Sequence, residues 1–397
     1  MGVNVFPAAS GGASYSSQPP ASASSVLLDG QLVTASSFST SVTGTGAPWL
    51  LYANGAGTTT ITIAGTPYTV TAGSTVGTSA YTGSQSVGVT TTATAPSTFT
   101  ASTMPSSSNW ASVTYGNGYF VAVQTSGTTA GAYSTNGTSW TASTMPSGGS
   151  AAGWTAVTYG NGYFVAVADS TTAGAYSTNG TTWTASTTPS ASSWRGVTYG
   201  NGYFVAVAFG AAGAYSANGT SWTASTMPSS SNWYGVTYGN GYFVAVAFGT
   251  TAGAYSTNGT TWTASTMPSS SGWIGVTYGN GYFVAVQTSG TTAGAYSTNG
   301  TSWTASTMPS SSQWRSVTYG NGYFVAVATG PSTVGAYSTN GTTWTASTMP
   351  SSSTWFSVTY GNGYYVAVAS STTAGAYFAQ TIFPVAYGIY NGPTATH

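Results

Sequence analysis

The sequence predicts an all-β protein, a seven-bladed β-propeller with four-stranded blades, and three observations support this prediction. A segment of the form W-x-x-V-T-Y-G-N-G-Y-[FY]-V-A-V occurs seven times, and its tryptophans recur every 39 to 44 residues. A period near 40 residues with strand signals alone is typical of propeller blades. The last repeat lacks its final strand, and a copy of that strand precedes the first repeat.

We number the repeats 1 to 7 by their first residues, which are Trp110, Trp154, Trp194, Trp233, Trp273, Trp314 and Trp355. Each repeat is interpreted as two hairpins. In repeat 1 the four strands are expected at residues 110–115, 119–123, 132–134 and 139–143. The first turn contains Asn117-Gly118 and the second contains Asn136-Gly137. Asn-Gly favours tight hairpins, because type I′ turns need positive φ at both central residues.

The ends of the repeat region indicate a closed ring. Repeat 7 departs from the pattern after residues 376–377, and residues 99–105 match residues 140–146 of repeat 1. An N-terminal strand is therefore expected to complete the last blade, which removes the exposed edges of an open sheet. A solenoid is the main alternative, but an open solenoid has no need of this offset, and no segment has helical periodicity.

Four regions are expected along the chain. Residues 1–24 are rich in Ser, Ala, Gly and Pro and predict a flexible arm. Residues 25–96 predict a small β module for attachment, with one hairpin at 26–33 and another around 65–67. The propeller spans residues 97–378. The tail, residues 379–397, is apolar and is expected to dock, the small module being a candidate surface.

Charge is nearly absent from the composition. Charged residues make up 1% of 397 residues, where about 25% is usual. The ionisable residues besides the tyrosines are Asp29, Asp169, Arg195, Arg315 and His397. Two arginines are too few to bind nucleic acid or anionic lipid, and no run of about 18 apolar residues predicts membrane insertion. The N-terminus lacks the segments of a secretory signal.

A second motif, Y-S-x-N-G-T-[ST]-W, resembles the Asp-box of sialidase-like propellers over residues 97–378. The resemblance implies that the Ser and the acidic position bind the turn backbone and that the aromatic residue packs between strands. These structural roles would fall to Ser134 and to the Asn and Trp pairs Asn136 and Trp140, Asn179 and Trp183, Asn218 and Trp222, Asn258 and Trp262, Asn299 and Trp303, and Asn340 and Trp344. Asn replaces the usual Asp, but it makes the same Asx-turn bonds. The near-identical repeats also resemble virion-associated propellers of tailed bacteriophages.

No catalytic set is evident in the sequence. The chain has no Glu, so the residues of a sialidase site are missing, and a carboxylate pair would require Asp29 to meet Asp169. The single histidine is the last residue, and there is no cysteine, so no metal site is expected. From this we expect no enzyme and no cofactor.

The repeats differ from one another in two places, after the first tryptophan and in the loop between the second and third strands. These variable positions supply the candidate binding residues Asp169, Arg195, Phe209, Tyr234, Phe248, Arg315 and Phe356. Loops on a rigid scaffold often carry recognition, and drift at tolerant positions is the alternative interpretation. Arg195 and Arg315 are expected nearly across the ring, so a small ligand would reach both only over the central channel.

These observations predict a non-enzymatic virion structural protein of a bacteriophage, as a tail fibre, spike or capsid decoration. Its N-terminal module would bind other virion proteins, and its propeller would attach to a host surface glycan or protein. The expected location is the virion. The alternative is a secreted or cell-surface lectin-like adhesin.

Overall fold

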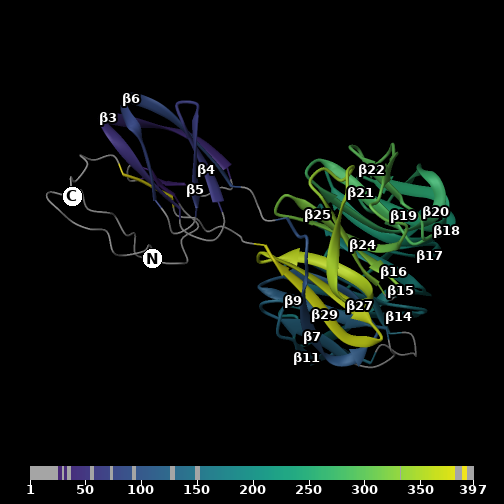
Figure 1. The fold of residues 1–397 in the computed structure, drawn as a ribbon. Helices are drawn as coiled ribbons and strands as arrows, with labels where there is room; N and C mark the ends of the chain where they lie inside the picture. Colours follow the sequence, from purple (N-terminus) through teal and green to yellow (C-terminus); the bar gives the residue numbers. More distant parts are fainter. Residues whose placement is uncertain are drawn as a thin grey trace. The chain divides into compact units, whose positions relative to one another are not determined.

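The structure, a computed structural model, describes residues 26–28, 31–33, 37–53, 58–71, 75–91, 95–125, 130–147, 153–330, 332–380 and 387–390. In this part of the chain the protein consists of strands and turns with no helix, which confirms the all-β class. The chain forms two compact units, one of Met1–Thr94 with Thr381–His397 and the other of Ala95–Gln380 (Figure 1). We call these the N-terminal unit and the ring unit.

The N-terminal unit contains one sheet with the strand order β2-β1-β30-β3-β6-β4-β5. Its strands are β1 (Val26–Leu28), β2 (Gln31–Val33), β3 (Ser37–Ala53), β4 (Thr58–Ile63), β5 (Thr66–Thr71), β6 (Thr75–Thr91) and β30 (Tyr387–Tyr390). The predicted hairpin at 26–33 is β1 paired with β2. The hairpin of β4 and β5 turns at Ala64 and Gly65, whose φ values are 50° and 83°. This turn lies one residue earlier than expected, because the two positive-φ positions precede Thr66.

The C-terminal tail contributes β30 to this sheet. It lies between β1, to which it is parallel, and β3, to which it is antiparallel. Segments from both ends of the chain therefore build one sheet. The expected flexible arm, residues 1–24, lies outside the described residues. The long antiparallel pairing of β3 with β6 was not expected from the sequence.

The ring unit contains four sheets in the hydrogen-bonding pattern. The first two hold β8 (Trp110–Gly116), β9 (Tyr119–Gln124), β10 (Ala130–Ser134) and β11 (Thr141–Thr144), and β12 (Trp154–Gly160), β13 (Tyr163–Ala168), β14 (Thr171–Ser177) and β15 (Thr184–Ser192). The third holds β16 (Trp194–Gly200), β17 (Tyr203–Ser216), β18 (Thr223–Gly239), β19 (Tyr242–Ser256), β20 (Thr263–Gly279), β21 (Tyr282–Gln287), β22 (Ala293–Ser297) and β23 (Thr304–Thr307). The fourth holds β24 (Gln313–Gly320), β25 (Tyr323–Thr329), β26 (Ser332–Ser338), β27 (Thr345–Gly361), β28 (Tyr364–Ser370), β29 (Thr372–Ala379) and β7 (Thr100–Ser108).

Each repeat contributes antiparallel strands in the order expected, and some strands run from one repeat into the next. Strands β18, β20 and β27 each serve as the fourth strand of one repeat and the first strand of the following repeat. This continuity is why the third sheet has eight strands rather than four.

The core lies within and between the repeats. The first tryptophan of every repeat is at most 1% exposed, and the Val-Ala-Val run of each second strand is also buried. Between repeats, a tyrosine ring packs on a glycine of the preceding repeat. A Cβ placed at Gly116 would lie 2.0 Å from Cγ of Tyr159, so only glycine fits. The same contact recurs in each repeat, and Gly361 of repeat 7 contacts Tyr115 of repeat 1, so the packing is circular.

Closure by an N-terminal strand is present as the sequence predicts. Strand β7 pairs with β29, with Ala101 opposite Ala376. Just before β7, the backbone N–H of Phe99 donates to the carbonyl of Thr348 at 2.9 Å. The Phe99 ring is buried and its centroid lies 5.9 Å from that of Phe378. The segment therefore joins the last repeat to the one before it.

The two Asn-Gly turns of a repeat differ in conformation, contrary to expectation. In the first turn, Asn117 and Gly118 both have positive φ, at 45° and 81°, as a type I′ turn requires. In the second turn only Gly137 does, at 73°. There the Asn136 side chain accepts bonds from the backbone instead, so the turn extends to Ser139. For this reason the fourth strand begins at residue 141 rather than 139.

Candidate ligand-binding site at the mouth of the channel

A β-bulge places one side chain of each repeat at the centre of the ring. In every repeat the register between the first two strands shifts across the residue that follows the tryptophan. A bulged residue is left out of the ladder and its side chain is re-aimed. The bulged residues are Ala111, Thr155, Arg195, Tyr234, Ile274, Arg315 and Phe356. These are the positions at which the repeats vary most in side-chain chemistry.

The bulged residues surround a cavity of about 420 Å³ that we call the channel mouth. All seven repeats contribute residues to its wall, so it lies on the axis of the ring. The Asn-Gly turns lie at the other end of the first strands. There the turns of neighbouring repeats are joined, for example by Asn117 Nδ2 donating to the carbonyl of Thr178 at 3.1 Å. We call that end the turn face.

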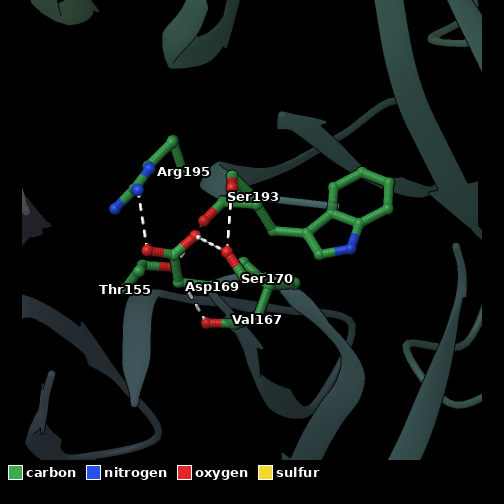
Figure 2. Close-up of polar contacts among 7 residues, drawn as sticks. Thr155, Val167, Asp169, Ser170, Ser193 and Arg195 are labelled. Atoms are coloured by element: carbon green, nitrogen blue, oxygen red, sulfur yellow. Dashed lines mark hydrogen bonds and ion pairs between the residues drawn. The ribbon is translucent and has the colours of Figure 1, made fainter. Parts of the chain in front are cut away.

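An ion pair occupies one side of the channel mouth. Arg195 Nη2 lies 2.7 Å from Asp169 Oδ2, and their side chains are only 21% and 18% exposed (Figure 2). Ser170 Oγ donates to the other carboxylate oxygen of Asp169 at 3.0 Å. Ser170 has a φ of 53° at the turn after β13. The pair joins repeats 2 and 3, and it holds the guanidinium in one orientation.

Tyr234 is the centre of an aromatic and cationic cluster. Its ring centroid lies 5.1 Å from that of Phe209 and 6.0 Å from that of Phe248. The guanidinium carbons of Arg195 and Arg315 each lie 5.8 Å from the Tyr234 centroid. Cation–π attraction contributes roughly 0.5–2 kcal/mol in such geometries. Phe248 is 43% exposed, so the cluster also presents an apolar surface to solvent.

Arg315 is held by aromatic rings rather than by a carboxylate. Its guanidinium carbon lies 3.9 Å from the Phe356 centroid. Burial lowers the pKa of Arg315, the nearby Tyr234 opposes this shift, and the Arg195 charge lowers the pKa further. Asp169 is the only carboxylate side chain among the described residues, and it pairs with Arg195. Arg315 therefore has no carboxylate partner in that part of the chain.

All seven candidate binding residues belong to this one connected cluster. Contacts run from Asp169 through Arg195, Phe209 and Tyr234 to Phe248, Arg315 and Phe356. A small ligand was expected to reach both arginines only over the central channel, and the two side chains lie together at the mouth of that channel. Both side chains leave their strands at bulges and meet at the same tyrosine ring.

Sequence comparison of the repeats missed part of the wall. Ile274 and Thr155 are bulged residues that line the channel mouth. Ser112, Ser316 and Ser357, which follow the bulge in their repeats, also line it. The column of residues after the tryptophan contains Ile274 and Thr155, so treating that whole column as one surface would have found them.

The second-turn motif makes the hydrogen bonds that the resemblance implies for its Ser and Asn. In repeat 1, Ser134 Oγ accepts the backbone N–H of Gly137 at 2.8 Å, and Asn136 Oδ1 accepts those of Thr138 and Ser139 at 2.9 and 3.0 Å. Equivalent bonds occur in the other five boxes. Trp262 and Trp344 are 8% exposed, and the other box tryptophans are partly exposed.

Within the described residues there is no group of three His, Cys, Asp or Glu side chains able to hold a metal ion. The same part of the chain contains no helix long and apolar enough to span a membrane.

Antiparallel sheets arranged in a ring about a channel define a β-propeller. Solved structures with this fold are similar to the ring. No family model matches the chain, and no curated protein does. Virginiamycin B lyase from Staphylococcus aureus has 14% identity and a TM-score of 0.63, covering 72% of this chain and 99% of the lyase. A streptogramin B lyase has 12% identity and a TM-score of 0.63, covering 70% and 97%. YCF48 bound to D1 peptide has 14% identity and a TM-score of 0.58, covering 72% and 97%.

These similarities correct one expectation from the sequence. The absence of a familiar catalytic set led us to expect no enzyme, and the likeness to two lyases overturns that prediction, because the same architecture carries catalysis in them. At 12–14% identity the likeness establishes the fold and assigns no reaction to this chain.

Proposed function

We propose that this protein recognises a ligand at the channel mouth. The observation that carries the proposal is the single cluster formed by the seven candidate binding residues on a scaffold whose repeats are otherwise nearly identical. Aromatic rings beside a few directed polar groups are typical of ligand sites. The ligand is a glycan or a protein on a host surface. The bound D1 peptide named for YCF48 supports a protein ligand as one of the two.

The ring is proposed to have seven blades, one for each repeat, with the second-turn motif acting as an Asp-box. Seven bulges and a circular set of tyrosine–glycine contacts support this count. The Ser and Asn hydrogen bonds support the Asp-box role.

The proposed setting is a bacteriophage virion, where the protein would form a fibre, spike or capsid decoration. The resemblance of the repeats to virion-associated propellers supports this setting. The N-terminal unit would bind other virion proteins. A lectin-like adhesin at a cell surface is the second candidate, and the exposed Phe248 beside Tyr234 favours it, since such rings stack on sugars.

The ligand-binding proposal is tested with variants that borrow residues from other repeats. Phe248→Thr introduces the residue that repeats 1, 5 and 6 carry, and Tyr234→Ala introduces that of repeat 1. We expect the double variant to fold and to lose attachment to host cells. Thr257→Ala on the turn face is the matched control, because repeat 3 has Ala217 there. Full attachment by the double variant, or loss with Thr257→Ala, would place recognition elsewhere.

The setting is tested by mass spectrometry of purified phage particles and of cell envelopes from the same culture. The virion proposal expects the intact chain in the particles. Its presence in envelopes alone would favour the adhesin.

A further inference from the structure

The inner edge of the ring is not uniform. In repeats 6, 7 and 1 the residue two places after the tryptophan is a serine whose hydroxyl accepts a backbone N–H from the next repeat. Ser316 accepts from Val358 at 3.1 Å, Ser357 from Val113 at 3.1 Å, and Ser112 from Val157 at 3.2 Å. These bonds satisfy donors on the free edges of the first strands.

In the other four repeats this serine is missing. Its place is taken by Ala156, Gly196, Gly235 and Gly275. We call these four residues, together with the backbone of the next repeat that faces each of them, the open arc. None of these residues has a hydroxyl, so no serine oxygen is present to accept from the equivalent N–H groups of Val197, Val236, Val276 and Val317. All four valines line the channel mouth. They belong to repeats 3 to 6, whose bulged residues are Arg195, Tyr234, Ile274 and Arg315.

The glycines also allow neighbouring strands to approach closely. A Cβ at Gly235 would lie 2.4 Å from the carbonyl oxygen of Ile274, and one at Gly275 would lie 2.7 Å from that of Arg315. The open arc therefore carries backbone acceptors as well as donors. The side chains decide which charge the site prefers.

The side chains give the channel mouth a net positive charge. Arg195 and Arg315 contribute two charges and Asp169 removes one, which leaves +1 among the described residues. Arg195 is already paired. Arg315 is half-buried between two rings with no carboxylate partner in that part of the chain, and a half-buried cation in a polar cavity is stabilised by an anion.

We propose that the channel mouth binds an oxyanion carried by the ligand, a carboxylate, sulfate or phosphate group, with Arg315 as its ionic partner and the N–H groups of the open arc as further donors. Tyr234 and Phe356 contact the apolar part of the ligand. This inference rests on the proposed function, because it names the chemistry recognised at the same site.

The two arginines allow a direct test on the full chain. Labelling with ¹⁵N-arginine gives two side-chain Nε–H signals, and Arg315→Thr assigns them, since Thr155 shows that the scaffold accepts threonine at this position. The probes are benzoate, phenyl phosphate and phenyl sulfate, with benzyl alcohol as the neutral match. We expect a saturable shift of the Arg315 signal with at least one anion, and binding at least tenfold weaker for the alcohol. The preferred probe distinguishes a carboxylate from a phosphate or sulfate ester.

Two controls complete the test. Amide shifts of Val236 and Val276 follow the same titration if the open arc takes part, and Thr257→Ala leaves the affinity unchanged. Arg315→Thr weakens binding of the preferred anion at least tenfold. The inference is overturned if no anion gives a saturable shift, or if benzyl alcohol binds as tightly as the preferred anion.

The outcome is separable from that of the proposed function. Loss of host attachment in the Tyr234 and Phe248 double variant, with no anion binding, would keep the channel mouth as the recognition site and remove the oxyanion. Anion binding by the wild type, together with normal attachment by the double variant, would keep the oxyanion site and place host recognition elsewhere.

Discussion

At the channel mouth, the Tyr234 ring lies near two aromatic rings and two guanidinium groups. One residue per repeat, placed at a bulge, therefore contributes a variable side chain to the cavity. The scaffold tolerates Ala, Thr, Tyr, Ile, Arg and Phe at this position, because the bulged side chain enters the cavity rather than the packed core. The site can be altered one residue at a time without redesigning a strand.

Arg315→Thr is expected to leave the melting temperature unchanged or to raise it in the absence of ligand. The cation–π contacts contribute about 0.5–2 kcal/mol, and removing a cation that lacks a carboxylate partner relieves its desolvation and its repulsion from Arg195. Thermal unfolding at low ionic strength measures the difference. Asp169→Asn is the contrasting variant, because it leaves Arg195 unpaired and should lower the melting temperature. A large loss of stability in Arg315→Thr would show that this arginine is structural.

Tyr365 is a second residue that departs from the repeat, since the other six repeats have Phe at its position. Its single hydroxyl proton is shared between the carbonyls of Gly320 and Tyr323 in repeat 6. Burial raises its pKa well above the usual value of 10, and burial raises the pKa of its neighbour Tyr360 to about 12. Because the pKa of Tyr365 is raised in the folded state, the stabilisation contributed by its neutral hydroxyl is complete below about pH 10. This stabilisation is lost as the pH rises from there through the folded-state pKa.

Tyr365→Phe is therefore expected to cost about 1–2 kcal/mol at pH 8, because the shared hydrogen bond is lost and two carbonyls lose their contact with this hydroxyl. Above pH 10 the gap should narrow, since the unfolded wild-type chain ionises Tyr365 and the variant has nothing to ionise there. Urea unfolding at pH 8 and pH 11 measures both values. A gap that stays constant across this range would contradict the assigned burial of the hydroxyl.

Among the elements, the two turns of each repeat show what sequence can and cannot predict. Asn-Gly correctly predicted both turn positions, and its φ preference correctly predicted the first turn. The second turn differs because the side chains of Ser134 and Asn136 hold it by accepting backbone N–H groups, and Asn136 does not adopt a positive φ. That choice depends on buried packing, since a Cβ at Gly137 would lie 2.4 Å from Val366 Cγ2 in repeat 7. A local pattern cannot report such a contact, because it joins two neighbouring repeats of the ring through residues far apart in the sequence.

This difference predicts unequal effects of one substitution at two glycines. Gly118→Ala places a side chain in open space, so it should cost only the left-handed strain of about 1–2 kcal/mol. Gly137→Ala has the same φ penalty and also meets Val366, so it should cost more. Chemical unfolding of the two variants gives the comparison. Equal losses would mean that Val366 moves aside freely.

For the whole molecule, the missing last strand of repeat 7 and its copy before repeat 1 were sufficient to predict the closing strand. The variable columns identified seven residues that the structure brings together in one cluster. Their meeting at Tyr234 could not be predicted, because the bulge that redirects Arg195 and Arg315 arises from strand register. The sheet formed from both ends of the chain was also beyond prediction in detail, since the pairing of β30 joins residues more than 300 positions apart.

Ring closure should be sensitive to Phe99, which stands where the other repeats have a box tryptophan. Phe99→Ala removes a buried ring and should cost about 3–5 kcal/mol. Phe99→Trp introduces the residue of the other boxes and should be tolerated better. Thermal unfolding followed by size-exclusion chromatography measures both effects, since an opened ring exposes the edge of β29 and should self-associate. Equal stability of the wild type and Phe99→Ala would show that closure does not depend on this ring.

The chain enters and leaves the ring unit at its turn face. Residues 97–99 lead into β7 and bond to Thr348 in the fourth strand of repeat 6, and the backbone N–H of Gln380 donates to the carbonyl of Gly363 in the first turn of repeat 7. A tensile force applied to a ligand in the channel mouth would therefore leave the ring through two covalent strands acting in parallel, each carrying part of the load. The ring unit is therefore connected to the N-terminal unit by two covalent links rather than one.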